Sequence, residues 1–339
     1  MEEFYCATSS ITLEHFFDFS FAPSLLLYSY LPIVVVTLLI GFFVFFKDKY
    51  SIQSKLLLGI GLSFAFWVLN IFLQWIAVYA SVVYFAWEIT PFIEILLPVF
   101  TLYFVYVFLE KKDLSMNLKL LLATIVVSVC VLLPSSVNIV SFDLVNCEAN
   151  LGPLIHYVYA FEVLAALWIL FFGLRKYFKL KKLEVVSSEQ KKQILFITIS
   201  SSIFLLIFAL SNIIGEITQT YEINLFGPIG MVVFIGFLTF MIVKFKTFNI
   251  KLFTAQVLVW GLIFMIGAQF FFIKVPINFL LTGVTFISVL FFGHFLVNGV
   301  RKEIEQKESL QILNLELQDL IKQRESLVYL ITHKIKGSF

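Results

Sequence analysis

Residues 82–109 read VVYFAWEITPFIEILLPVFTLYFVYVFL, an apolar run whose only charged side chains are Glu88 and Glu94. About 20 apolar residues in a helix cross the roughly 30 Å hydrocarbon core of a bilayer. Eight further runs of this kind are present, at residues 24–46, 56–80, 118–137, 152–174, 194–214, 226–243, 252–272 and 279–300. We therefore predict an all-α fold, a polytopic bundle of about nine transmembrane helices. The runs do not alternate apolar and polar residues as the strands of a membrane β-barrel do.

The composition of the chain supports a membrane protein. Of 339 residues, 60% are hydrophobic and 14% are charged, and the mean hydropathy is +0.99. No soluble fold buries that much apolar surface. The net charge of +2 is too close to balance to indicate a nucleic-acid partner, so membrane lipid is the expected environment and no nucleic acid is expected.

The basic residues predict the orientation of the chain. Between the runs, Lys and Arg fall on alternate connections, from residues 47–55 to residues 301–302, and Lys274 alone lies on the other side. Basic loops stay in the cytoplasm. We therefore expect a multi-pass protein of the inner (plasma) membrane with its N-terminus outside and its C-terminus in the cytoplasm. This topology requires a very tight outer turn at residues 79–84.

Three cysteines are too few for a disulfide framework. The predicted topology places Cys6 in the outer N-terminal segment 1–23 and Cys147 in the outer loop 138–150, whereas Cys130 lies inside the fourth span. A Cys6–Cys147 disulfide is possible in an oxidising compartment. Two unpaired thiols are the alternative.

The composition changes at Arg301, after which charged residues become frequent. Two apolar seams with heptad spacing follow, displaced by one residue: Val297, Val300 and Ile304, then Leu310, Leu313, Leu317, Leu320, Leu327 and Ile331, interrupted at Arg324. We expect the ninth span to continue as one helix into a parallel coiled-coil homodimer with a register break near Lys307. A helix that folds back on the bundle is the alternative.

His333 follows this seam. With Leu327 and Ile331 on the seam, the imidazole falls two positions beyond a core residue and faces solvent. A neutral imidazole nitrogen can attack a phosphoryl group. Taken alone, an exposed histidine on a helix is usually a surface residue.

The surroundings of His333 resemble the H-box of sensor histidine kinases. Residues 330–336 read LITHKIK, with Thr332 before the histidine and Lys334 and Lys336 after it. The membrane part resembles the seven-helix type of sensor region in that family, through the basic, aromatic stretch 244–251. Together with the predicted topology, the resemblance divides the chain into an outer segment 1–23, a sensor region 24–250, two helices 251–300 that are extra relative to the seven-helix pattern, a coiled-coil linker 301–326 and the start of a phosphoacceptor helix 327–339.

The resemblance implies the membrane sensor part of a two-component system, with His333 as phosphoacceptor and a response regulator as partner. Three positions depart from the family pattern. Lys334 occupies the place of the usual acidic residue and cannot act as a base, and Gly337 and Ser338 replace the usual Asn or Thr followed by Pro. The sequence reaches Phe339 before any ATP-binding domain. ATP and Mg are therefore expected only with a kinase domain downstream or in trans, and this chain alone is not expected to phosphorylate itself.

Ionisable residues inside spans are candidate functional residues because they are costly in lipid. Glu88 and Glu94 flank Pro91 in the third span, and His156, Tyr159 and Glu162 lie in the outer half of the fifth span. These residues are candidates for a polar sensing pocket open to the outside, for a ligand or a proton. The sequence favours the other interpretation, a set of static interhelical hydrogen bonds without a ligand.

Other classes of membrane protein are less consistent with the sequence. A transporter would use similar buried carboxylates, but nine spans do not divide into equal inverted halves and no repeated motif is visible. A non-kinase membrane receptor or scaffold is a further alternative. The histidines at 15, 156, 294 and 333 fall in separate parts of the topology, so we expect no metal site.

Overall fold

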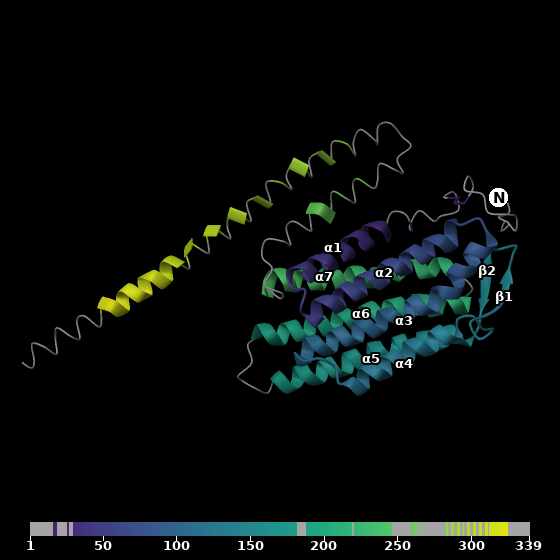
Figure 1. The fold of residues 1–339 in the computed structure, drawn as a ribbon, viewed down its shortest axis with the longest axis horizontal. Coiled ribbons are helices and arrows are strands. Elements are labelled where there is room, and N and C mark those ends of the chain that lie inside the picture. Colours follow the sequence, from purple (N-terminus) through teal and green to yellow (C-terminus); the bar gives the residue numbers. More distant parts are fainter. Residues whose placement is uncertain are drawn as a thin grey trace, which may run out of the picture.

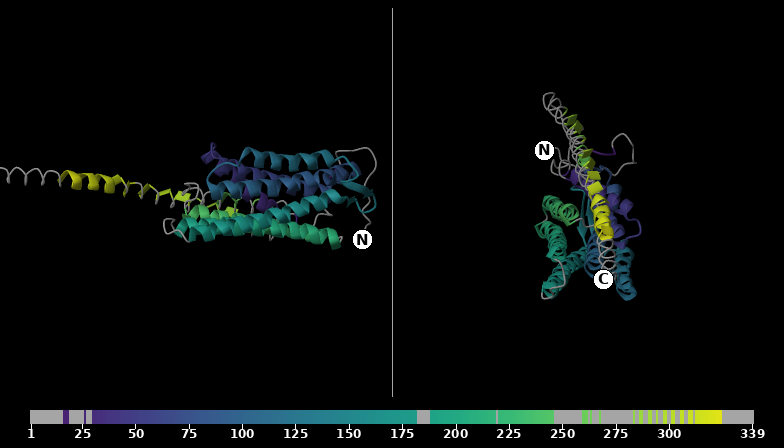
Figure 2. Two further views of the ribbon diagram at one scale, coloured as in Figure 1. Left: turned by 90° about the horizontal axis from the view of Figure 1, so that it is seen from below. Right: turned by 90° about the vertical axis from the view of Figure 1, so that its left-hand side faces the viewer.

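The structure is a computed structural model, and Figures 1 and 2 show its fold. It describes residues 16–18, 26, 30–181, 188–218, 220–245, 259–261, 263, 267, 283, 286–287, 290–291, 294, 297–298, 301–302, 305–306, 309–310 and 312–324. Within these residues, apolar helices account for most of the chain.

The bundle contains α1 (Leu31–Lys47), α2 (Ile52–Ile76), α3 (Ala80–Glu110), α4 (Met116–Leu132), α5 (Pro153–Lys181), α6 (Ser188–Thr218), the 3₁₀ helix η3 (Tyr221–Phe226) and α7 (Pro228–Phe245). The first seven predicted runs each correspond to one of the α-helices. By length and composition, α2, α3, α5 and α6 are sufficient to cross a membrane, and α1, α4 and the η3–α7 region contain shorter apolar helices. Much of the runs 252–272 and 279–300 lies outside the described residues.

The long helix α3 is the centre of the bundle. It packs against α2, α5, α4 and α6, and it continues through Pro91 and Pro98. Proline cannot donate a backbone hydrogen bond to the residue four positions earlier, so the carbonyl groups of Trp87 and Glu94 lose their usual helical partners. The helix ends at Lys111, whose left-handed φ of 55° turns the chain.

Aromatic side chains fill the core between the helices. The Trp67 ring lies edge-on to Phe208 with ring centroids 4.7 Å apart, and Phe204 stacks on Phe234 at 5.7 Å. All four rings are fully buried. Aromatic pairs of this kind contribute about 0.5–1.5 kcal/mol beyond their buried area.

The two ends of the bundle differ in the side chains and secondary structure that they carry. At one end, the Nζ of Lys176 on α5 lies 2.8 Å from Glu110 on α3, and Gln53 on α2 donates to the carbonyl of Val107 on α3 at 3.3 Å. This is the basic end, where Lys and Arg are frequent. The other end carries a two-stranded sheet (Figure 1).

That sheet is an antiparallel hairpin of β1 (Ile139–Asp143) and β2 (Glu148–Leu151). The sequence was expected to form only a loop there, in an all-α chain, so the hairpin is a difference from the prediction. The amide of Asn138 holds it on the bundle by donating to the carbonyls of Glu88 and Leu133, each at 2.9 Å. Cys147, with φ 56°, lies at its turn.

The connection between α2 and α3 is as tight as predicted, but it lies earlier, at Ala77–Tyr79 rather than at residues 79–84. Here the chain pairs with a distant segment. The Asp18 backbone N–H donates to the Ile76 carbonyl at 2.8 Å, and Phe17 forms a β-bridge with Ala77. These bonds satisfy backbone groups that a tight turn leaves without helical partners.

Residues 312–324 form a helix whose residues are all exposed. Figure 1 shows this helix projecting well beyond the bundle. Its exposed apolar side chains include Leu313, Leu317 and Leu320, at 62%, 55% and 61% exposure. These are the seam positions predicted from the sequence.

The packing of α7 on α6 gives a prediction with an internal control. A Cβ atom at Gly230 would come within 2.7 Å of the Phe204 carbonyl oxygen, whereas a Cβ at Gly236 meets no atom within 4 Å. Both changes to alanine gain the same helix propensity, so their difference isolates the clash. We expect Gly230→Ala to be about 1–3 kcal/mol less stable than Gly236→Ala. Thermal unfolding in detergent measures the difference, and equal unfolding midpoints would contradict the α6–α7 packing.

Candidate functional site

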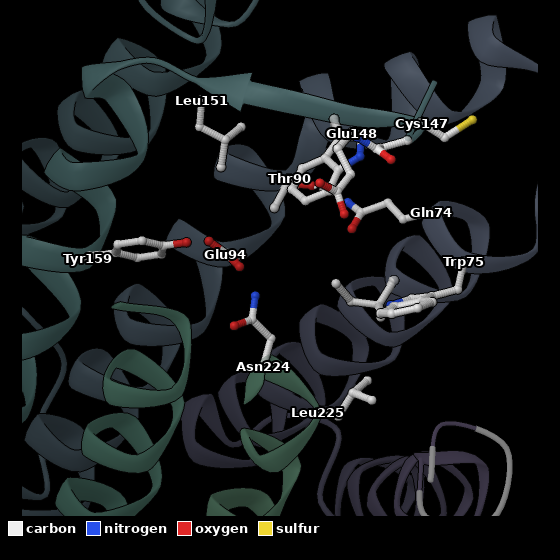
Figure 3. A pocket seen from close by; sticks show the side chains of 13 residues that line it. Gln74, Trp75, Thr90, Glu94, Cys147, Glu148, Leu151, Tyr159, Asn224 and Leu225 are labelled. Atoms are coloured by element: carbon white, nitrogen blue, oxygen red, sulfur yellow. Dashed lines mark hydrogen bonds between the residues drawn. The ribbon is translucent and has the colours of Figure 1, made fainter. Parts of the chain in front are cut away.

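A cavity of about 240 Å³ lies at the hairpin end of the bundle (Figure 3). It is lined from α2 by Ile71, Gln74 and Trp75, from α3 by Trp87, Thr90 and Glu94, from the hairpin by Asn146, Cys147, Glu148 and Leu151, from α5 by Tyr159, and from η3 by Asn224 and Leu225. Side chains from three helices, the hairpin and η3 therefore meet at one site.

Glu94 is the deepest acidic group of the cavity, with an exposed fraction of 3%. Its Oε1 accepts a hydrogen bond from Trp67 Nε1 at 3.1 Å and another from Asn212 Nδ2 at 3.3 Å. Its Oε2 has no partner among the described residues. One carboxylate thus joins α2, α3 and α6 and still has an acceptor free toward the cavity.

Glu162 on α5 is fully buried, and neither of its carboxyl oxygens has a hydrogen-bond partner within the described part of the chain. It is close enough to Glu94 for the two ionised groups to repel each other. An isolated buried charge is strongly unfavourable in a low-dielectric interior. The pair therefore requires a proton or a bound cation to balance its charge.

A second polar group fixes α2 to α3 beside the cavity. The Thr90 hydroxyl oxygen accepts from Asn70 Nδ2 at 2.9 Å and from Gln74 Nε2 at 2.8 Å. The same hydroxyl donates to the Ala86 carbonyl at 2.8 Å. These bonds lie in the turn just before Pro91, where the backbone of α3 lacks a donor.

Asn224 enters the cavity from η3. Its backbone carbonyl accepts a bond from the hydroxyl of Tyr30, at 3.2 Å, across 194 positions of sequence. The side-chain oxygen lies so near Gly215 that a Cβ there would approach it to 2.0 Å. This oxygen has no donor among the described residues. It faces α6, and Figure 3 shows the amide nitrogen of Asn224 on the side of Glu94.

The hairpin contributes a second carboxylate to the cavity. Glu148 lies opposite Asp143 in the strand register. Partial burial, followed by repulsion from Asp143, raises the pKa of Glu148 above its ordinary value. The pKa of Asp143 is lowered, chiefly by the hydrogen bond from the Val145 backbone N–H, so Asp143 stays ionised at neutral pH.

The structure brings together part of the predicted sensing pocket. Glu94 and Tyr159 line the cavity, and Figure 3 shows the Tyr159 hydroxyl pointing toward Glu94. Glu162 is buried near Glu94, as described above. The other two residues lie elsewhere: His156 is exposed, and Glu88 is half-buried outside the cavity lining.

Sequence reasoning missed several residues that surround the cavity. Asn212 and Gln74 are polar residues inside apolar runs, so their cost in lipid was an available signal. Trp67 carried no such signal, because a tryptophan in an apolar run also fits as packing. The places of Asn224 and Glu148 in the cavity could not be predicted, because they depend on the positions of η3 and the hairpin, and neither element was predicted.

Several predicted residues lie outside the described part of the chain: Cys6 and the H-box residues Thr332, His333, Lys334 and Lys336. Their roles stay predictions. Cys147 is disulfide-bonded and Cys130 is a free, exposed cysteine. Because Cys6 is not described, the Cys6–Cys147 pairing also stays a prediction.

Within the described residues, no three His, Cys, Asp or Glu side chains are arranged to hold a metal ion. Comparisons of the chain with protein-family models, with curated proteins and with solved structures give no match. The functional interpretation therefore depends on the residues themselves.

The bond between Trp67 and Glu94 can be tested by a double-mutant cycle. Trp67→Phe removes the indole donor but leaves a ring, and we expect it to destabilise the protein by about 1–3 kcal/mol because a buried acceptor loses its donor. In a Glu94→Leu background the same change should cost about 0.5–3 kcal/mol less. Thermal unfolding in detergent measures all four proteins. Trp168→Phe, an exposed tryptophan of α5, is the control and should be additive with Glu94→Leu, whereas additivity of Trp67→Phe would contradict the bond.

Proposed function

We propose that this chain is the membrane sensor part of a two-component histidine kinase, which passes a signal from the bundle to His333 on a dimeric cytoplasmic helix. The observation that carries the proposal is the exposed apolar seam of residues 312–324, which leads toward the H-box-like stretch LITHKIK. The alternatives are a polytopic transporter and a non-kinase receptor or scaffold.

The proposed topology has nine membrane spans, the N-terminus outside and the C-terminus in the cytoplasm. Four described helices are long and apolar enough to cross a bilayer. Lys176, which pairs with Glu110, belongs to the basic end of the bundle. Because basic segments are retained in the cytoplasm, the basic end faces inward and the hairpin and its cavity face outward.

The proposed dimer is supported by the surface of the helix 312–324. Leu313, Leu317 and Leu320 recur at alternating steps of four and three residues, the spacing of a coiled-coil seam. All three are exposed in the single chain. Apolar stripes of this length in water are stabilised when a second helix covers them, and a second copy presents an identical stripe.

Phosphoryl transfer would proceed by attack of a neutral imidazole nitrogen of His333 on the γ-phosphorus of ATP. The bond to the β,γ-bridging oxygen breaks, ADP leaves, and the imidazole loses its N–H proton. A kinase domain, downstream or in trans, would supply ATP and Mg, and a response regulator would receive the phosphoryl group. Lys334 cannot take the proton, so the base must come from elsewhere.

The mechanism that we propose for signalling is a shift or rotation of the helix that leaves the membrane, relative to its dimer mate. Such a change alters packing across the register break near Lys307 and thereby the exposure of His333. The signal would enter at the cavity, because Glu94 contacts side chains from α2 and α6 and a change there moves more than one helix.

The seam can be tested by cysteine cross-linking in membranes. In a Cys130→Ser background, we expect Leu317→Cys to form a disulfide-linked dimer quickly on mild oxidation, because seam residues of a parallel coiled coil face each other. Leu315→Cys, two positions away on the opposite face, is the matched control and should cross-link at least several-fold more slowly. Gel electrophoresis without reductant measures both. Equal rates would exclude this seam.

The phosphoacceptor can be tested by combining the chain with a histidine-kinase nucleotide-binding domain in trans and radiolabelled ATP. We expect acid-labile phosphate on the wild type and none on His333→Gln, whereas His294→Gln should be labelled normally. Lys334→Glu places a carboxylate where the family has one, and we expect labelling to be about 10-fold or more faster because a positioned base contributes 10²–10⁴-fold. Equal labelling of His333→Gln and wild type would exclude His333.

A further inference from the structure

The cavity at the hairpin end is acidic. Glu94 and Glu148 both line it, and the described residues that line it include no Lys, Arg or His. Its volume of about 240 Å³ is far larger than the roughly 10–15 Å³ that one water molecule needs. The space therefore suits a small molecule rather than a bare ion.

The deepest carboxylate of the cavity keeps an acceptor without a donor. Glu94 Oε2 has no partner among the described residues, and only 3% of Glu94 is exposed. Figure 3 shows Glu94 between Tyr159 and Asn224. Buried acceptors of this kind are strongly unfavourable without donors, so the complementary ligand brings N–H groups and positive charge.

The walls of the cavity are aromatic. Trp75 from α2, Trp87 from α3 and Tyr159 from α5 line it on different sides. Tryptophan and tyrosine rings attract organic cations through their π-faces, and the attraction is larger where water is excluded. A carboxylate beside such rings is typical of sites that recognise an ammonium group with an apolar stem.

We propose that this cavity binds a small protonated organic amine, whose ammonium N–H groups donate to Glu94 Oε2 and whose stem lies between the aromatic walls. The proposal rests on the proposed function only in treating this amine as the sensed signal. The amine enters beneath the hairpin, and its positive charge balances the carboxylate pair of Glu94 and Glu162. Because Glu94 also bonds Trp67 and Asn212, the bound amine acts on α2, α3 and α6 together.

The experiment is a binding titration on the full chain in lipid nanodiscs. The probes are methylammonium, butylammonium and benzylammonium chloride, with benzyltrimethylammonium, benzyl alcohol and benzoate as comparators. We expect at least one N–H-bearing ammonium ion to bind and to raise the unfolding temperature. Benzyl alcohol has no charge and benzoate has a negative one, so both should bind at least 10-fold more weakly than benzylammonium. Benzyltrimethylammonium should also bind more weakly than benzylammonium, because it has no N–H donor.

Variants of the lining residues test the geometry. We expect Glu94→Gln to weaken binding about 10-fold or more, because it removes a charged acceptor. Trp75→Ala should weaken binding because it removes one of the aromatic rings that line the cavity. This variant still tests the proposal if Glu94→Gln fails to fold. Glu189→Gln, the same change at an exposed site on α6, is the matched control and should bind as the wild type does.

The proposal is overturned if no ammonium probe binds, if sodium or calcium ions compete as well as the amines do, or if a folded Glu94→Gln and Trp75→Ala both bind with unchanged affinity. These results are separate from the phosphotransfer test. A failure of amine binding leaves labelling of His333 intact, and a failure of labelling leaves amine binding intact.

Discussion

The bundle depends on how it accommodates a carboxylate inside an apolar interior. Neither lipid nor packed aromatic rings can solvate Glu94, so the protein supplies donors from two other helices, the Trp67 indole and the Asn212 amide. Each donor can reach Oε1 only if α2, α3 and α6 keep their relative rotation and height. The same bonds that satisfy the charge therefore set the packing of three helices. A purely apolar core of similar volume would specify this arrangement less strictly, because apolar contacts tolerate sliding.

The backbone of α3 obeys a related constraint. In an apolar environment each backbone polar group needs a partner within the protein, yet Pro91 and Pro98 each remove one donor. The carbonyls freed by these prolines belong to Trp87 and Glu94, which are two of the residues that line the cavity. Just before Pro91, the Ala86 carbonyl accepts from the amide of Asn70 at 3.0 Å. The irregular backbone of α3 thus coincides with the cavity, where polar groups are already gathered.

The helices were predicted well from the sequence, because the length and hydropathy of each apolar run reflect the need to bury apolar side chains in a helix. Seven apolar runs match α1–α7 within a few residues at most ends. The hairpin was not predicted, since a stretch of this length that follows a span reads equally well as a loop, and its register depends on anchoring by Asn138. In the site, Glu94 and Glu162 were identified through their cost in lipid, and Tyr159 through its position three residues from both His156 and Glu162. His156 and Glu88 were grouped with them because helical spacing alone does not reveal which face of α3 or α5 turns inward, and the partners Trp67 and Asn224 required tertiary contacts that no local pattern contains.

Contacts of α1 and of the residue before it connect the cavity to described residues of the eighth apolar run. Tyr30, just before α1, donates to the backbone of Asn224, a cavity residue. On α1, a Val36 methyl group lies 3.1 Å from where a Cβ at Gly261 would stand, so Gly261 lies close to α1 and a side chain there would press on Val36. Gly267 of that run lies in turn near the Phe286 ring of the ninth. Contiguity alone does not transmit a signal; a two-state element is needed. Such an element would have to include Tyr30 and Asn224 together, because a shift of η3 that moves the Asn224 carbonyl must either move Tyr30 with it or break their hydrogen bond.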